Sequence, residues 1–206
     1  MSPITLLYET ERLLVVDKPS GLLSVPGRTA DKSNCVLSRL RQSFPEALVV
    51  HRLDRDTSGL LVFARDEETQ RSLGRQFEQR SVAKTYTAIV EGIVTDNQRI
   101  DLPMRRDITV SLPPTYIVDR DQGREAITDL EVASVSGDRT RVTLRPRTGR
   151  SHQLRVHCKA IGHPIVGDPI YGNPINGERL MLHAHKLSFR NPATHDMLEF
   201  ESPVPF

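Results

Sequence analysis

Two short apolar runs with a charged segment between them constrain this chain most. The runs are Leu48–Val50 and Leu60–Ala64, and the residues between them are rich in Arg, Asp, Thr and Ser. Runs of this length with β-branched residues are typical of strands, so we expect two strands joined by a polar loop. Asp54 then lies at a strand end, and the nearby Arg52 and Arg55 favour its ionised form. The spacing alone favours a turn-forming role, whereas an oriented carboxylate would be able to act as a nucleophile.

Periodicity predicts a mixture of short strands and a few helices along the rest of the chain. Asp66 is a plausible helix cap, and Gly162 is a natural helix stop. Short connections between strands favour an α+β fold on an antiparallel sheet, and no Pro/Gly/Ser-rich linker divides residues 1–206, so we expect one domain. The further expected strands are Leu6–Tyr8, Leu13–Asp17, Ala83–Glu91, Ala126–Val135, Thr140–Leu144, Met181–Phe189 and Met197–Glu201; the helices are Val36–Phe44, Glu67–Gln79 and Gln153–Ile161.

The distribution of charge is more informative than its total. A net charge of +2 is only mildly basic and neither demands nor excludes a nucleic-acid partner. Arginines make up 23 of the 28 basic residues, which fits either phosphate binding or a codon bias. Between Arg139 and Arg155 there are six arginines and no acidic residue, and we predict phosphate contacts there.

Several other chemistries find no support in the sequence. Ser58 is not in a Gly-x-Ser-x-Gly elbow, and the chain has neither a phosphate-binding loop nor a dinucleotide fingerprint. His51, His152 and His157 lack supporting metal-ligand spacing, so we expect no metal. The two cysteines fit no disulfide framework and are expected to be small buried or half-buried side chains. Apolar runs are too short to span a bilayer and no leader pattern is present, so we expect a cytoplasmic protein with no membrane partner.

Three motifs resemble one known family. His51–Asp54, followed by Thr57–Gly59, resembles the signature of the pseudouridine synthases of the ribosomal large subunit synthase A type. Arg147–His157 matches a second motif in the order that the family requires. Lys18–Arg28 resembles the amino-terminal segment of the family's dual-specificity branch. The resemblance covers the chain from about Leu7 to about Pro203.

The resemblance implies a fold and an activity. The fold is a single catalytic domain on a large mixed, mainly antiparallel sheet with flanking helices and a catalytic cleft across its middle. The activity is the isomerisation of uridine to pseudouridine in RNA, which needs no cofactor. The expected partners are stem-loops of 23S ribosomal RNA and transfer RNA, with no DNA, and the chain is expected to act as a monomer without a separate RNA-binding domain before the catalytic one. A relative with a single RNA target is the alternative.

The resemblance also implies roles for individual residues. Asp54 matches the catalytic aspartate, and whether it attacks C1′, adds to C6 or assists a glycal route stays open. Tyr86 matches a tyrosine beside the target base, and Arg155 an arginine that pairs with the catalytic carboxylate. The pattern alone also allows a half-buried strand tyrosine and a solvent-facing helix arginine. Arg52 matches the arginine that replaces the flipped nucleotide, and the alternative is a plain surface arginine. The other residues matched to RNA binding and base flipping are His51, Arg150 and Leu154, of which Leu154 is expected to form an apolar wall.

Two further function classes compete with RNA isomerisation. A glycoside hydrolase would use Asp54 and Asp56 as its two carboxylates, because both reactions break a bond at an anomeric carbon. Residues two apart on a strand share a face, which does not give the separation across a sugar that such a pair requires. A non-catalytic RNA-binding module is the other class. Release of tritium from 5-tritiated uridine in RNA indicates isomerisation, free uracil indicates hydrolysis, and neither product indicates binding alone.

Overall fold

A computed structural model describes residues 4–27, 33–111, 113–172 and 178–206 of the chain. Its contacts divide the chain into a first unit, residues 1–84 and 183–205, and a second unit, residues 85–182 with Phe206. Arg28, the last residue of the Lys18 motif, lies outside the described residues. The expected single catalytic domain stays a prediction, and each unit is described by itself.

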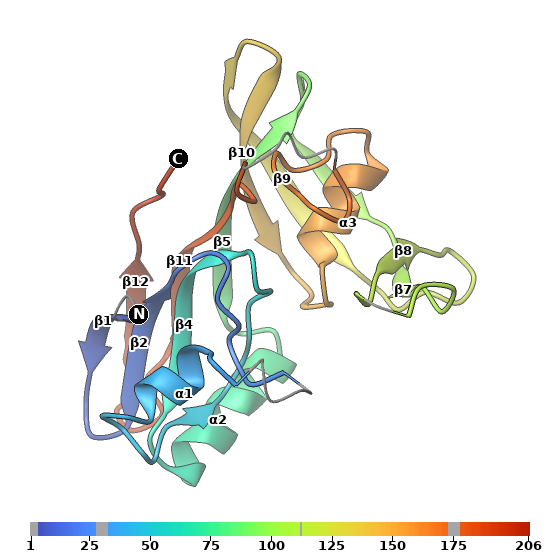
Figure 1. Cartoon of the computed structure of the whole chain (residues 1–206). Helices are drawn as coiled ribbons and strands as arrows, with labels where there is room; N and C mark the ends of the chain where they lie inside the picture. Colours follow the sequence, from blue (N-terminus) through green and yellow to red (C-terminus); the bar gives the residue numbers. More distant parts are fainter. Residues whose placement is uncertain (1–3, 28–32, 112, 173–177) are drawn as a thin grey trace. The chain divides into compact units, whose positions relative to one another are not determined.

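The first unit is built on strands that surround a buried central strand, β4 (Ser58–Ala64) (Figure 1). All seven residues of β4 are buried, as expected for a strand covered on both faces. Its antiparallel neighbours are β2 and β3, and its parallel neighbour is β11. The other strands of this unit are β1 (Thr5–Glu9), β2 (Leu13–Lys18), β3 (Leu48–Val49), β11 (Leu182–Arg190) and β12 (Met197–Glu201).

Two helices complete the first unit. α2 (Glu67–Glu78) begins at Asp66, whose carboxylate accepts a hydrogen bond from the Thr69 amide, and it buries Leu73 against alternate residues of β2, β4 and β11. α1 (Val36–Leu40) is capped by Cys35 and is shorter than the expected Val36–Phe44. The Ser43 and Phe44 amides both bond to the Leu40 carbonyl, so the chain continues as a turn, and Pro45 has no amide hydrogen with which to extend the helix.

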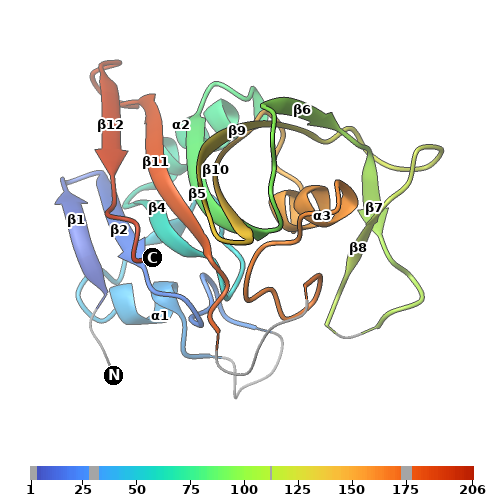
Figure 2. The ribbon, with the colours of Figure 1, turned by 90° about the horizontal axis from the view of Figure 1, so that it is seen from above.

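The second unit contains the antiparallel strands β5 (Ala83–Glu91, of which residues 85–91 belong here), β10 (Arg139–Pro146), β9 (Ile127–Ser136) and β6 (Gln98–Asp101), hydrogen-bonded in that order. α3 (Gln153–Ala160) lies against these curved strands (Figure 2). Its Leu154 and Cys158 join a core formed by aliphatic residues of β5, β9 and β10. A hairpin, β7 (Met104–Arg106) and β8 (Tyr116–Val118), packs beside α3 through a smaller cluster that includes Val156 and Tyr171.

The predicted fold class is confirmed. The strand pairs given above are antiparallel except β4 with β11, so the architecture is mixed and mainly antiparallel, with few helices. The strands β6, β7 and β8 were not predicted, because they are short and rich in charged or isolated apolar residues. None of the helices in the described part of the chain combines the length and the apolar character needed to cross a membrane.

Candidate active site

Asp54 lies in the loop between β3 and β4 of the first unit. The loop alternates in exposure: Leu53 and Thr57 are buried, Asp54 is half-buried, and Arg52 and Arg55 are exposed. The buried residues anchor the loop on both sides of Asp54. A half-buried carboxylate between two anchors is held in place and is still accessible, as a reacting group must be.

Side chains of the Lys18–Ser24 segment hold the backbone of this loop. Ser24 Oγ donates to the Leu53 carbonyl at 2.7 Å and accepts from the Leu53 amide at 3.1 Å. The buried Lys18 ammonium donates to the carbonyl oxygen of Arg55 at 2.8 Å and to that of Leu22 at 2.7 Å. Ser20 Oγ donates to the Asp56 carbonyl at 2.6 Å. The backbone is therefore fixed immediately before and after Asp54.

The motif's histidine supports the same loop. The His51 ring stacks on Phe77, with centroids 4.5 Å apart, and its Nε2 accepts a hydrogen bond from the Val62 amide at 3.2 Å. Burial and the nearby charge of Lys84 lower the pKa of His51 to about 3. The ring is therefore neutral at neutral pH and is not a cation for phosphate. Its expected role in RNA binding stays a prediction.

Arg52 differs from its neighbours in the loop. Its side chain is exposed, and among the residues that the structure describes it has no hydrogen-bond or ion-pair partner. Arg55, by contrast, donates to the Asp56 carboxylate at 3.0 Å. An exposed guanidinium two residues before Asp54, without such a partner, fits the expected insertion into an RNA stack.

The end of the first motif is structural. Ser58, the first residue of β4, is 2.9 Å from His183 Nδ1, and both side chains are buried. His183 Nε2 lies 3.1 Å from Ser202 Oγ, which donates to Asp17 at 2.8 Å. Because a carboxylate only accepts, Ser202 accepts from His183 Nε2–H, and Nδ1 accepts from Ser58. This serine–histidine pair is thus committed to a buried chain of hydrogen bonds, which agrees with the absence of a nucleophile elbow.

Gly59 completes this junction. It has a φ of +111°, and a Cβ at this position would lie 2.4 Å from the carbonyl oxygen of Ala184. The close parallel approach of β4 and β11 therefore excludes any side chain at residue 59.

In the second unit, two expected site residues share one apolar cluster. Leu154, on the first turn of α3, is buried in the core of this unit, and Tyr86 of β5 packs against the same core. Tyr86 pairs with Leu144 of β10. The structure thus brings Tyr86 and Leu154 together in one core, and their roles beside a base stay predictions.

Arg155 has a buried acidic partner that sequence reasoning missed. Its Nε and Nη2 each donate to Asp168 at 2.8 Å, and the two side chains are 2% and 0% exposed. Burial opposes the ionisation of Asp168, but the hydrogen bond and charge of Arg155, together with the amides of Tyr171 and Ile170, outweigh it and lower its pKa. The alternative of a solvent-facing helix arginine is therefore excluded, and the pairing of Arg155 with Asp54 stays a prediction.

The turn before α3 is strained and tightly bonded. His152 has a φ of +56°, and its Nδ1 is 2.8 Å from the hydroxyl of Tyr171. Left-handed backbone in a residue other than glycine is uncommon and is concentrated at functional sites. The Gln153 side chain bonds the Arg150 amide at 3.0 Å, and the Arg150 guanidinium donates to the Glu125 carbonyl at 2.9 Å. The second motif therefore fixes the turn that carries Arg150 and leads into Arg155.

The arginines between residues 139 and 155 do not form an uncompensated basic strip. Arg139 is 2.8 Å from Glu178, Arg145 is 2.6 Å from Glu131, and Arg147 is 2.6 Å from Asp129. These acidic residues lie outside the segment 139–155 and come close to the arginines through sheet pairing and loops. The sequence of the segment alone therefore does not show that its arginines are paired. Phosphate contacts here would require the exchange of solvent-exposed ion pairs, and this role stays a prediction.

The other chemistries can be compared with the geometry. Within residues 4–27, 33–111, 113–172 and 178–206, no three His, Cys, Asp or Glu side chains gather into a possible metal site. Cys35 and Cys158 are buried and free, as expected, and burial with the charge of Asp168 raises the pKa of Cys158 to about 12. Asp56, which would be the second carboxylate if the chain were a glycoside hydrolase, is paired with Arg55.

Comparisons with known proteins agree with these motifs. A family model for RNA pseudouridylate synthase matches residues 12–160. The chain is 42% identical to the dual-specificity RNA pseudouridine synthase RluA of Escherichia coli (strain K12), covering 98% of this chain and 94% of that protein. Its identity to the same enzyme of Yersinia pestis is 44%, over 97% and 96% of the two chains. The structure of human RNA pseudouridylate synthase domain containing 1 matches with a TM-score of 0.83 and 33% identity, over 100% of this chain and 87% of that one.

These matches confirm the family that the three motifs indicated. They cover both units, because residues 12–160 include the Asp54 loop, Tyr86 and Arg155. The chain therefore belongs to the RNA pseudouridylate synthase family and is an RNA pseudouridine synthase, an intramolecular isomerase.

Proposed function

We propose that this enzyme isomerises loop uridines in both ribosomal and transfer RNA, with Asp54 as its catalytic carboxylate. The relatives from Escherichia coli and Yersinia pestis are named dual-specificity enzymes, which supports two classes of RNA substrate. In the reaction the N1–C1′ bond breaks, the base turns, and C5 bonds to C1′. C5 loses a proton and N1 gains one, so nothing is oxidised and no energy source is consumed.

The hydrogen bonding on both sides of Asp54 carries this proposal. Ser24 fixes residue 53, and Lys18 and Ser20 fix residues 55 and 56. A catalytic carboxylate must be held within a fraction of an ångström of its productive position, and backbone anchors on both sides provide this. Asp56, the other carboxylate of the motif, forms an ion pair with Arg55.

The other residues of the motifs take supporting roles in the proposal. Tyr86 lies against the target base and accepts a proton during the reaction. Arg155, oriented by Asp168, acts on the Asp54 carboxylate. Arg52 takes the place of the extruded nucleotide, because the reactive bond is accessible only after the uridine leaves its stack. His51 and Arg150 support the RNA-binding surface, and Leu154 supplies apolar wall. Since both RNAs are cytoplasmic, the enzyme acts there, as a monomer.

Substitution of Asp54 tests the assignment. We expect Asp54→Asn to abolish tritium release from 5-tritiated uridine in RNA, with RNA affinity within about tenfold of wild type, roughly 1.4 kcal/mol. Affinity is retained because phosphate contacts are spread over the surface. The matched control is Asp56→Asn, which removes a carboxylate two residues away and should keep most of the activity. Turnover by Asp54→Asn would overturn the assignment, and release of free uracil with equal sensitivity of both aspartates would favour the glycosidase.

The choice of substrate is tested in the same assay. Side chains cannot read the deep, narrow major groove of paired A-form RNA, so a loop uridine is the expected target. Hairpins cut from ribosomal and from transfer RNA should therefore be modified with a kcat/KM near that of the intact molecules. A hairpin with the uridine moved into its stem is the control. Activity on only one class of RNA indicates a single-target enzyme, and equal activity on the stem uridine would contradict recognition of loops.

A further inference from the structure

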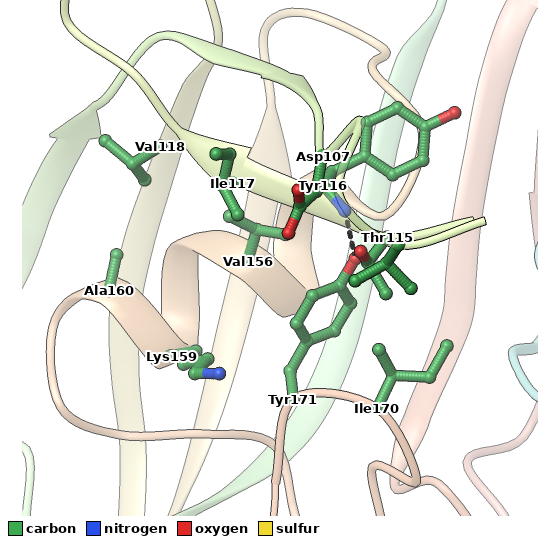
Figure 3. A pocket seen from close by; sticks show the side chains of 11 residues that line it. Asp107, Thr115, Tyr116, Ile117, Val118, Val156, Lys159, Ala160, Ile170 and Tyr171 are labelled. Atoms are coloured by element: carbon green, nitrogen blue, oxygen red, sulfur yellow. Dashed lines mark hydrogen bonds between the residues drawn. The ribbon is translucent and has the colours of Figure 1, made fainter. Parts of the chain in front are cut away.

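A cavity of about 440 Å³ lies in the second unit, between the β7–β8 hairpin and α3 (Figure 3). Val156, Lys159 and Ala160 of α3 line one side, and Ile117 and Val118 of β8 line another. Tyr171 and Ile170 complete the wall, with Asp107, Val110, Thr115 and Tyr116 from the hairpin. The volume falls in the range of pockets that hold small organic groups.

The walls of this cavity are mainly apolar but not closed. Ile117, Val118 and Ile170 are each only half-buried, so solvent reaches aliphatic side chains that elsewhere in this unit are packed away. Beneath them Tyr171 and Val156 belong to a small buried cluster that fixes the floor. A hollow with a rigid floor and partly exposed apolar sides favours an occupant with a flat apolar body.

The cavity also contains a few polar groups in distinct places. Thr115 Oγ1 is buried and has no hydrogen-bond partner among the residues that the structure describes. The Lys159 ammonium is 5.8 Å from the centre of the Tyr171 ring, on an exposed side chain. Asp107 accepts from the hydroxyl and the amide of Thr109 at 2.6 and 2.9 Å, so its carboxylate is engaged within its own turn. One exposed cation thus lies at the cavity, and one buried hydroxyl in its wall has no partner among the described residues.

We propose that this cavity binds an unstacked base of the RNA substrate, at a position other than the target uridine. A base has flat apolar faces for the aliphatic walls and a hydrogen-bonding edge for Thr115, and its phosphate is anionic and would meet Lys159. Single-stranded RNA is recognised by such pockets, in which side chains stack on a splayed base and bond its edge. The proposal rests on the RNA substrate of the proposed function, because the reaction brings loop nucleotides, already partly unstacked, to this protein.

The cavity is joined to the functional motif through Tyr171. The Tyr171 hydroxyl accepts from the Tyr116 amide at 2.9 Å and is 2.8 Å from His152 Nδ1. Its ring lies 5.1 Å from the guanidinium carbon of Arg155. A base in the cavity would contact a ring that borders Arg155 and would restrain the turn before α3. We therefore expect occupancy to affect kcat as well as KM.

The test combines missing bases in the RNA with a filled cavity in the protein. Hairpin substrates are prepared with a single abasic residue at each unpaired position in turn, and kcat/KM is measured by tritium release. Ala160→Phe places a ring in the cavity, and Ala133→Phe, at an exposed alanine of β9 in the same unit, is the matched control. Thr115→Val removes only the hydroxyl and keeps the shape of the wall.

For the wild type we expect one abasic position, besides the target, to lower kcat/KM at least tenfold. Ala160→Phe should lower kcat/KM on the intact hairpin by a similar factor and should lose most of its sensitivity to that position. Thr115→Val should lower kcat/KM severalfold only when that base is present, and Ala133→Phe should resemble the wild type.

Identical abasic profiles for the wild type, Ala160→Phe and Thr115→Val would overturn the proposal, as would a loss that is equal for every RNA. Thr115→Val gives the decisive comparison if Ala160→Phe does not fold. Failure of the proposed function would be recognised separately, because the wild type would then release no tritium from the intact hairpin.

Discussion

The two units hold their functional residues in different ways. In the first unit, the hydrogen bonds from Ser24, Lys18 and Ser20 end on backbone atoms of residues 53, 55 and 56. In the second unit, Arg155 is held by its own charged group, through two hydrogen bonds to the buried Asp168. One residue is positioned through its neighbours, and the other through its side chain.

The difference follows from what each group has to do. The anchors around Asp54 end on backbone atoms, so they fix the course of the loop through several buried polar atoms that must all be satisfied. A bidentate ion pair fixes the plane of the Arg155 guanidinium and leaves Nη1 outside that pair. Loss of a backbone anchor should therefore shift the geometry of the loop, whereas loss of the ion pair should leave a buried charge without compensation.

The ion pair should give the largest effect. Asp168→Asn removes the charge opposite Arg155, and we expect the free energy of unfolding to fall by about 3–5 kcal/mol, with loss of isomerase activity. The matched control is Asp129→Asn, whose carboxylate also pairs with arginine, here with Arg99 and Arg147, but is 29% exposed; it should cost less than about 1 kcal/mol. Denaturant unfolding at neutral pH checks both. Equal small losses would show that burial does not distinguish the two pairs.

The backbone anchor should give a smaller loss of stability but a specific kinetic change. Ser24→Ala leaves the amide and the carbonyl of Leu53 without partners, and we expect it to cost about 1–3 kcal/mol. Because Asp54 is the next residue, kcat should fall tenfold or more while KM stays within about twofold. Ser24→Thr keeps the hydroxyl and should restore kcat. Ser20→Ala, which loses one hydrogen bond to the Asp56 carbonyl, is the control. An unchanged kcat in Ser24→Ala would show that the backbone anchor at Leu53 does not position Asp54.

The low pKa of His51 makes the stability of the protein depend on pH. Burial and Lys84 hold this pKa at about 3, below its unfolded value of about 6.5. Between these values the unfolded chain binds a proton that the folded chain does not, so stability rises with pH across this window and is lost as pH falls. We expect His51→Gln to reduce the difference in unfolding free energy between pH 7 and pH 5 by about 2 kcal/mol. The exposed His195→Gln is the control, and equal pH dependence in all three proteins would contradict a buried neutral His51.

The exposed arginines of the second unit should give the smallest effect on stability. Arg145→Gln breaks a pair whose side chains are 50% and 49% exposed, and we expect a change below about 1 kcal/mol. If Arg145 exchanges Glu131 for a phosphate, the salt dependence of RNA affinity should fall by about one ion. Arg12→Gln, in a similarly exposed pair of the first unit, should leave that slope unchanged. Equal slopes for both variants and the wild type would exclude Arg145 from phosphate binding.

Local patterns predicted the elements that carry strong local signals. Asp66 with the periodicity of Leu73 and Phe77 marked α2, and alternation placed β5 at Ala83–Glu91, the same bounds that the structure has. The strands β6 to β8 were missed because they are only three or four residues long, too short for an alternating pattern to show.

The motifs named candidate site residues, and nothing in the sequence indicated the partners that lie far from them in the chain. Asp54, Tyr86 and Arg155 came from motif resemblance, whereas Asp168 follows a buried run with no local sign that it faces Arg155. Ser24 was part of a recognised motif, but its contact with Leu53 spans 29 residues. The acidic partners of Arg145 and Arg147 were missed for the same reason, since cross-strand pairing has no signature in the neighbouring sequence.

The parallel pairing of β4 with β11 sets a limit on when the first unit can be completed. Ser58 and His183 are 125 residues apart, and the absence of a Cβ at Gly59 lets the backbone of Ala184 approach closely. During synthesis the strand that follows Asp54 is made early, but its neighbour leaves the ribosome only after the whole second unit. Contacts of such long range form late, since the chain must close a large loop before they stabilise it. The nascent chain therefore carries the Asp54 loop without the neighbouring strand β11 until residues 183–190 have been made.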